Sequence, residues 1–270
     1  MLSFRLRACA AAFLLCIGAV VHAQVAKSVF LEELTWTELR DQIRAGKSTV
    51  IVPVGGTEQS GPNIVLGKHN VRVRVLAGRI AASLGNAIVA PVLAYVPEGG
   101  IDPPTGHMRF AGTLSIPESA FETTLEYTAR SLRQAGFRDI VLIGDHGGYQ
   151  KSLTRVATRL DREWAASPVR VHAVLEYYGA VAGDADPALR KLGLSEAEIG
   201  THAGASDTSL ALAVDPQLVR GERLHDGTAL GPDEGVHGDP RRASAAAGRA
   251  GVDAIVARTS EAIRKDVSRR

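Results

Sequence analysis

Four short apolar runs alternate with longer amphipathic segments, and this alternation limits the fold more than any other feature of the chain. The apolar runs span residues 50–54, 87–92, 139–144 and 169–175. Helical patterns at about residues 71–84, 117–135 and 151–165 separate them. Strands that alternate with helices predict an α/β fold with a mostly parallel sheet covered on both faces.

Further helices are expected on either side of this region. Thr35, three residues before Glu38, has the form of a capping box that opens a helix ending near Ala45. The alanine-rich last third predicts helices at about residues 208–213 and 242–265. Long loops at residues 103–104 and 231–235 could cover a site, support a subunit contact or simply connect elements. No repeat or linker divides the chain, so a single domain is expected over residues 24–270.

The first 23 residues have the form of a secretory signal peptide. Arg5 and Arg7 precede an apolar run over residues 8–21, and the small Ala23 suits cleavage before Gln24. The run is too short to span a membrane comfortably, and no later segment is long and apolar enough. We therefore expect a periplasmic or secreted protein without a membrane partner. Both cysteines lie in this segment, so the mature chain is expected to be stabilised by core packing alone.

Charge gives no reason to expect a nucleic-acid partner. The formal net charge of the whole chain is +2. The signal segment holds two arginines and no acidic residue, so the mature chain is expected to be neutral. A neutral chain without a dominant basic run lacks the attraction that nucleic acids and anionic membranes exert on basic proteins.

Two glycine-rich loops follow apolar strands and carry side chains that can bind metals. Glu58 and His69 lie in the loop of residues 55–70, and His146 lies in the loop of residues 144–149. Because α/β sheets bind ligands at the carboxyl ends of their parallel strands, we expect the two loops to bring these side chains together. The alternatives are an ordinary turn for the first loop and a structural, hydrogen-bonded role for the histidine.

The remaining histidines include two further candidates for the site. His202 and Asp207 lie in a third loop, residues 200–209, where Asp207 could instead cap the helix that follows. His107, in a loop rich in proline and glycine, is a further candidate. Three more histidines fall in a strand or lack a second ligand type nearby, and are interpreted as structural or solvent-exposed. They are His172, His225 and His237.

Five short motifs are spread over most of the mature chain. They are Gly-Gly-Thr-Glu-Gln at 55–59, Gly-Pro at 61–62, Phe-Ala-Gly-Thr at 110–113, Asp-His-Gly-Gly at 145–148, and His-Ala-Gly followed by Asp-Thr-Ser within 202–209. Together they resemble the creatininase family, also called creatinine amidohydrolase-like proteins. The resemblance implies a three-layer α/β/α sandwich, metal-dependent hydrolysis of non-peptide and often cyclic amides, a small-molecule amide substrate, and a homo-oligomer that is commonly a hexamer.

The resemblance also implies roles for single residues. Glu58 and His146 match ligands of the first metal ion, and His202 matches an active-site histidine. Asp207 matches the acidic position of the family's Glu-Thr-Ser motif. His69 stands where the family has the aspartate that bridges two metal ions. Since a neutral imidazole offers one lone pair and cannot readily bridge two cations, we expect one ion per subunit, bound by Glu58, His69 and His146.

Three other positions depart from the family pattern. Ser60 and Asn63 stand where the family has histidines, and Gly148 stands where creatininase itself has an acidic ligand. These losses remove ligands of a second ion and make creatinine itself a doubtful substrate. Residues expected to contact the substrate or to support the site are Ser60, His107, Asp145, Gly147 and Gly148.

The expected chemistry follows from a carboxylate and two imidazoles, a ligand set of catalytic zinc sites. Zinc is the first choice of ion, and manganese or iron are possible because the same groups bind all three. Metal-bound hydroxide would attack the amide carbonyl while His202 or Asp207 moves a proton to the leaving nitrogen. Asp207 could equally be a fourth ligand.

Two other functions fit the same residues. A lactone or formamide hydrolase could use the same metal-bound hydroxide, because the metal fixes the nucleophile better than it fixes the substrate. An exported oligomeric binding protein could have kept the fold while its site only holds a metal or a small molecule. The enzyme is favoured because His69 replaces an acid with another good ligand rather than with an inert residue.

Overall fold

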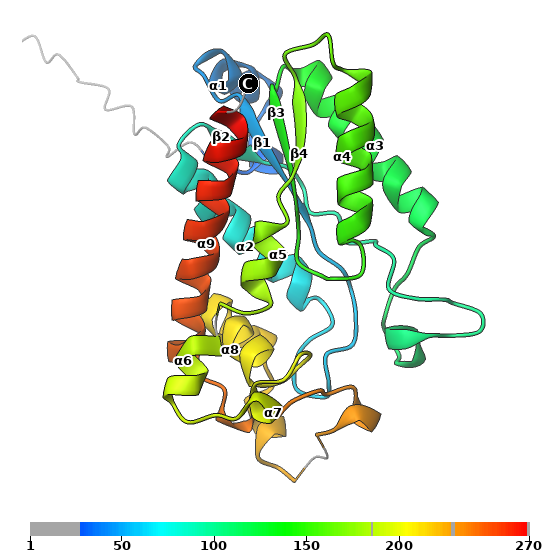
Figure 1. Cartoon of the computed structure of the whole chain (residues 1–270), viewed down its shortest axis with the longest axis vertical. Helices are drawn as coiled ribbons and strands as arrows, with labels where there is room; N and C mark the ends of the chain where they lie inside the picture. Colours follow the sequence, from blue (N-terminus) through cyan, green and yellow to red (C-terminus); the bar gives the residue numbers. More distant parts are fainter. Residues whose placement is uncertain (1–27, 185, 228–229, 269–270) are drawn as a thin grey trace, which may run out of the picture.

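The centre of the molecule is a four-stranded, fully parallel sheet (Figure 1). The computed structural model describes residues 28–184, 186–227 and 230–268, so the expected signal peptide lies outside the described part. The strands are β1 (Thr49–Val54), β2 (Ala87–Val89), β3 (Asp139–Gly144) and β4 (Arg170–Ala173). They are ordered β2-β1-β3-β4, and all three pairs are parallel. The sequence prediction of a parallel sheet is therefore confirmed.

Helices cover both faces of this sheet. One layer consists of α3 (Glu118–Ala135) and α4 (Gln150–Glu163), and the opposite layer contains α2 (Lys68–Leu84), α5 (Glu176–Val181) and α9 (Ala245–Ser268) (Figure 1). Side chains of β1 point alternately to the two layers. Val50 and Val52 pack in the core with α3 and α4, and Ile51 packs in the core with α2, α5 and α9. Every residue of β1 is buried. The fold is thus the expected α/β/α sandwich.

Several element boundaries differ from the sequence prediction for identifiable reasons. The strand expected over residues 87–92 ends at Val89, since Pro91 has no N–H to continue the ladder. Helix α2 begins at Lys68 rather than near residue 71, because the Gly67 carbonyl already accepts the first helical hydrogen bond. His69 therefore lies in the first turn of a helix and not in the loop that contains Glu58.

The helix at the amino-terminal side agrees with the prediction. It is α1 (Trp36–Arg44), and Thr35 and Glu38 form the expected capping box. The last third is more helical than expected, with α6 (Asp186–Lys191), α7 (Glu196–Ile199) and α8 (Ala205–Val214) before α9. Short 3₁₀ helices span Leu31–Glu33, Gly106–Arg109, Pro216–Leu218, Gly221–Leu224, Pro232–Glu234 and Pro240–Arg242.

The sheet order creates one position suited to a ligand. The chain leaves β1 toward β2 on one side of the sheet, while β3 and then β4 lie on the other side. Connections therefore diverge between β1 and β3, and open parallel sheets bind ligands at such a point, beyond the carboxyl ends of the strands. Among the residues that the structure describes, none forms a helix long and apolar enough to cross a membrane.

Candidate metal centre

Glu58 and His146 meet beyond the carboxyl ends of β1 and β3. Val54 and Gly144, the last residues of these strands, are paired in the sheet, and each is followed by the loop that carries one of the two side chains. The His146 Nε2 atom lies 3.4 Å from Glu58 Oε2. Adjacent parallel strands therefore bring the two loops together, as the sequence predicts.

His107 completes a group of three potential metal ligands. It lies in the 3₁₀ helix Gly106–Arg109, and its Nε2 is also 3.4 Å from Glu58 Oε2. Potential ligand atoms of Glu58, His107 and His146 all lie within 4.8 Å of one another. Glu58 Oε2 is buried and has no hydrogen-bond partner in the described part of the chain. From the sequence, His107 is expected to contact the substrate or to support the site, not to bind the ion.

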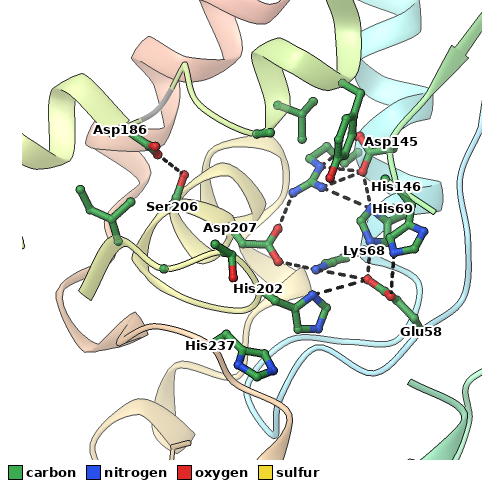
Figure 2. Close-up of a pocket in the computed structure, with 18 of the residues that line it drawn as sticks. Glu58, Lys68, His69, Asp145, His146, Asp186, His202, Ser206, Asp207 and His237 are labelled. Atoms are coloured by element: carbon green, nitrogen blue, oxygen red, sulfur yellow. Dashed lines mark hydrogen bonds and ion pairs between the residues drawn. The ribbon is translucent and has the colours of Figure 1, made fainter. Parts of the chain in front are cut away.

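His69 contacts Glu58 through the other carboxylate oxygen. Its Nε2 lies 2.6 Å from Glu58 Oε1, and its Nδ1 lies 2.5 Å from Asp145 Oδ1. Both ring nitrogens therefore face carboxylates, as the close-up shows (Figure 2). Burial raises the pKa of Glu58, but the hydrogen bond from His69 outweighs it and holds this pKa well below its usual range. Glu58 thus remains an anion with one free oxygen.

Two further cations reach the site from the first turns of α2. Lys68 Nζ forms an ion pair with Asp207 Oδ2 and lies 3.7 Å from Glu58 Oε1. Arg72 bonds Asp145 through Nε at 2.9 Å and Asp207 through Nη1 at 2.7 Å. Lys68 and Arg72 are only 1% and 2% exposed. Neither residue is predicted from the sequence, because the carboxylate partners Asp145 and Asp207 lie far along the chain.

Asp207 is held by this cationic cluster rather than left free. Besides Lys68 and Arg72, the backbone N–H of Ala203 donates to it at 3.1 Å. Burial raises the pKa of Asp207, but Lys68 and Arg72 outweigh it and hold this pKa far below its usual range. Asp207 is the third residue of α8, and the helix begins after Gly204 without a side-chain cap.

His202 is a neutral imidazole beside the centre. Its Nε2 lies 3.0 Å from the Gln59 carbonyl oxygen and 3.2 Å from the Gln59 side-chain nitrogen, and a proton on Nε2 makes the shorter of these two contacts a hydrogen bond. Its Nδ1 lies 3.8 Å from Glu58 Oε1 and keeps a lone pair. Burial, together with the charge of Lys68, lowers the pKa of His202 to about 4. Burial likewise lowers the pKa of His146 to about 4, which keeps this ring neutral and available to a metal at neutral pH.

The other predicted site residues take different positions. Asp145 is buried and accepts a hydrogen bond from Tyr177 at 2.6 Å in addition to its contacts with His69 and Arg72. Gly147 lines the cavity, where an added Cβ would lie 2.5 Å from the Tyr178 hydroxyl. Ser60 and Gly148 do not line it, and Ser60 is fully buried.

The histidines that the sequence analysis set aside are distributed as follows. His172, in β4, lies 3.1 Å from Asp139 through Nε2 and is structural. His225 is exposed. His237 is exposed as expected, but it also faces the site, since its ring centroid is 6.5 Å from that of His202 (Figure 2).

A cavity of about 650 Å³ opens over these groups. Its walls come from the strand-end loops, the start of α2, and the segments around α5 to α8, and they include Glu58, Lys68, His146, His202 and His237. A second cavity of about 600 Å³ shares His107 and His237 with the first. Volumes of this size suit a small organic molecule.

Comparison with known proteins gives a consistent result. A family model described as creatinine amidohydrolase matches residues 32–263. The chain is 31% identical over 210 residues to the creatinine amidohydrolase of Pseudomonas putida, covering 75% of this chain and 78% of the relative. It is 30% identical over 233 residues to the mycofactocin precursor peptide peptidase of Mycolicibacterium smegmatis, covering 78% and 83%.

Solved structures similar to this one include metal-bound creatininases. One is described as creatininase with manganese, with a TM-score of 0.72, 28% identity, and coverage of 89% of this chain and 99% of the other. Another is a creatininase variant of the Zn–Zn type, with a TM-score of 0.72, 26% identity, and coverage of 90% and 99%. A divalent metal is therefore the cofactor that both the residues and the similar proteins indicate.

Proposed function

This chain belongs to the creatininase family and is a metal-dependent hydrolase of carbon–nitrogen bonds other than peptide bonds, and on that premise we propose that its substrate is a small, non-peptide and cyclic amide. The observation that carries the proposal is the free oxygen of Glu58, which lies 3.4 Å from Nε2 of both His107 and His146 at the floor of the cavity.

These three groups fit a divalent metal. Tetrahedral zinc with bonds of about 2.0–2.2 Å separates its ligand atoms by roughly 3.3–3.6 Å, and the two measured separations of 3.4 Å fall in this range. The unpartnered, buried Glu58 Oε2 is otherwise difficult to explain, since buried carboxylate oxygens are normally paired or bound to a cation. We propose zinc as the ion. When bound, it would activate water and polarise a carbonyl oxygen.

The cations of α2 support one ion per subunit rather than two. Lys68 and Arg72 already compensate Asp207 and Asp145, two carboxylates that line the cavity together with Glu58. A second divalent ion would meet two fixed positive charges there, at distances where repulsion is strong. The ammonium group of Lys68 and the guanidinium group of Arg72 therefore occupy the region that a second metal ion would need.

His69 has a proposed role different from the one expected from the resemblance. Because its two nitrogens face Glu58 and Asp145, we propose that it holds Glu58 in place and that His107 supplies the third ligand. His69 as a direct ligand stays a prediction that a variant can test.

His202 is the residue proposed to move the proton during hydrolysis. Its free Nδ1 faces the centre, and its low pKa keeps the ring neutral at neutral pH, so that it can take up a proton and, once protonated, release it readily to the leaving nitrogen. Asp207 is less suited to this role because Lys68, Arg72 and the Ala203 amide occupy its oxygens. It instead fixes the Lys68 ammonium, which lines the cavity and could stabilise negative charge on a substrate oxygen.

A substrate panel tests the proposal. Purified protein loaded with zinc would be incubated with five- and six-membered lactams and cyclic ureas, an N-formyl amine, a lactone and a short peptide, and ring opening or release of amine would be followed by mass spectrometry. Turnover of a cyclic amide that stops with a chelator and returns with zinc is the expected result. Turnover restricted to the lactone, formamide or peptide would contradict the proposed substrate class, and metal binding without any turnover would favour a binding protein.

Export and assembly are further parts of the proposal. The basic start, apolar run and Ala23 support removal of residues 1–23 and a periplasmic or secreted location. Mass spectrometry of the protein recovered from outside the cytoplasm should show a chain that begins at Gln24. We also propose a homo-oligomer, with a hexamer as the first candidate by family resemblance. Sedimentation velocity should then show a species far larger than one chain.

A further inference from the structure

Glu98 is a buried carboxylate that the site described above does not explain. It follows β2, in the segment that leads to the 3₁₀ helix Gly106–Arg109, and only 6% of the residue is exposed. Neither of its oxygens has a hydrogen-bond partner among the residues that the structure describes. Its carboxyl group lies beside that of Glu58, and the two can share a hydrogen bond when one of them is protonated. Placing such a group in a protein interior costs free energy unless something compensates it.

The surrounding segments hold Glu98 firmly in this position. Its backbone N–H donates to Ser115 Oγ at 3.0 Å, and the same hydroxyl donates to the Gly99 carbonyl at 2.8 Å. On the other side, Gly56 leaves space for the side chain, because a Cβ at that position would lie 2.6 Å from Glu98 Oε1. The loop that carries Glu58 thus also provides the surface against which Glu98 packs.

Glu98 reaches the metal centre at His146. Its Oε2 lies 3.4 Å from His146 Nδ1, while Nε2 of the same ring faces Glu58. A metal at Nε2 leaves the ring proton on Nδ1. Without a metal, the backbone N–H of Gly148 donates to Nδ1 at 3.3 Å, a long hydrogen bond that a proton on Nδ1 would displace. Of these two neighbours, Glu98 is the one that can accept the ring proton.

We infer that Glu98 is a positioning residue of the metal centre, which accepts the Nδ1 proton of His146 and holds the ring so that Nε2 faces the ion. The inference rests on the metal site of the proposed function and adds a residue to it. Metal-binding histidines commonly donate their second ring proton to a carboxylate, and loss of that carboxylate weakens metal affinity by about 10- to 100-fold. A role at His146 also explains why the Glu98 carboxyl group lies in the interior without another partner.

Two substitutions of Glu98 distinguish a role in metal binding from a role in stabilising the fold. Glu98→Leu removes the acceptor, whereas Glu98→Gln keeps a carbonyl oxygen that can accept the Nδ1 proton but cannot ionise. Metal-free proteins would be titrated with zinc against a chromophoric chelator. We expect the zinc Kd of Glu98→Leu to rise about 10- to 100-fold, that of Glu98→Gln to rise less, and the stoichiometry to stay unchanged in both.

The thermal unfolding of the metal-free proteins provides the second measurement. Both variants should unfold at the wild-type temperature or above it, because each removes a buried carboxyl group that has no N–H or O–H donor around it in the metal-free protein. A residue that only supports the fold would show the opposite, a lower unfolding temperature and an unchanged Kd. The matched control is Glu163→Gln. Glu163 is an exposed residue at the carboxyl end of α4, whereas His146 precedes the amino end of this helix, so the zinc Kd should stay unchanged.

The outcomes distinguish this inference from the function on which it rests. An unchanged zinc Kd in Glu98→Leu, with zinc bound by the wild type, would overturn the role of Glu98 and leave the proposed function standing. A wild type that binds no zinc would remove both. If Glu98→Leu bound no zinc under conditions that saturate the wild type, Glu98 would contact the ion itself, which contradicts a role through His146.

Discussion

The two oxygens of Glu58 have different environments, and the proposed chemistry depends on this difference. Oε1 takes the contact from His69 at 2.6 Å, while Oε2 has no hydrogen bond and lies 3.4 Å from His107 and from His146. A carboxylate held on one side and free on the other is oriented before an ion arrives. Such orientation by neighbouring groups raises metal affinity in protein sites.

Replacement of His69 by alanine tests its role at this carboxylate. If His69 positions Glu58, His69→Ala should still bind one zinc per subunit, with an affinity lower by about 10- to 100-fold. Isothermal titration of the metal-free variant with zinc measures both quantities. A variant that binds no zinc under conditions that saturate the wild type would show that His69 is itself a ligand, as the family resemblance implies.

The histidines of the site predict how the metal-free protein responds to acid. Burial holds the pKa of His146 and of His202 at about 4, against an ordinary value of 6.5. Between these limits the unfolded chain binds more protons at these two histidines than the folded chain does, so their contribution to the free energy of unfolding falls as the pH drops from about 6.5 to about 4. Urea unfolding in the presence of a chelator at several pH values measures this slope. In His202→Asn the fall should be shallower, and an identical fall would count against a buried, neutral His202.

At the scale of elements, α2 contributes both to the core and to the electrostatics of the site. Its apolar face packs under the sheet, while Lys68, His69 and Arg72 turn toward the carboxylates beyond β1 and β3. The end of this helix that faces the cavity therefore determines how much negative charge the site retains for a metal.

A pair of substitutions on α2 measures how much the buried ion pairs matter. Arg72→Met leaves Asp145 and Asp207 without their shared partner in the interior, and we expect it to destabilise the fold by about 3–5 kcal/mol. Arg79→Met, on the same helix, removes an ion pair with Asp253 whose side chains are 46% and 70% exposed, and should cost only about 0–1 kcal/mol. Denaturant unfolding of the two variants measures both changes in the free energy of unfolding. Equal changes would contradict the importance of the buried ion pairs of Arg72.

Part of this arrangement could be predicted from the sequence because it follows from local patterns. The apolar runs indicate the strands, and parallel strand ends bring Glu58 and His146 together whatever the details of the loops. The positions of His107 and Glu98 could not be derived in this way, since both lie on a long segment whose path depends on tertiary contacts with Ser115 and Gly56.

The buried cations were missed for a different physical reason. A lysine or arginine on an amphipathic helix is usually solvated, so Lys68 and Arg72 resemble surface residues until their carboxylate partners are known. Those partners, Asp145 and Asp207, lie more than 70 residues further along the chain. Contacts between residues so distant in sequence leave no periodic signal.

For the whole molecule, metal binding should be linked to folding. The proposed ligands come from three separate segments, namely the loops after β1 and β3 and the 3₁₀ helix Gly106–Arg109, so an ion that binds only the folded state would hold these segments together. Zinc at 100 times its Kd should raise the free energy of unfolding by about 2.7 kcal/mol. Thermal melts with and without zinc measure the effect. Glu58→Gln should show none of it, and equal stabilisation of the variant would mean that zinc binds elsewhere.

The metal content of the purified protein tests the central claim most directly. Elemental analysis per subunit, on protein loaded with zinc and then passed through a desalting column, should give one ion for the wild type and none for Glu58→Ala. Two ions per subunit would contradict the proposal that Lys68 and Arg72 replace a second metal. No retained ion in the wild type would contradict the metal centre itself and leave the three converging side chains without their proposed function.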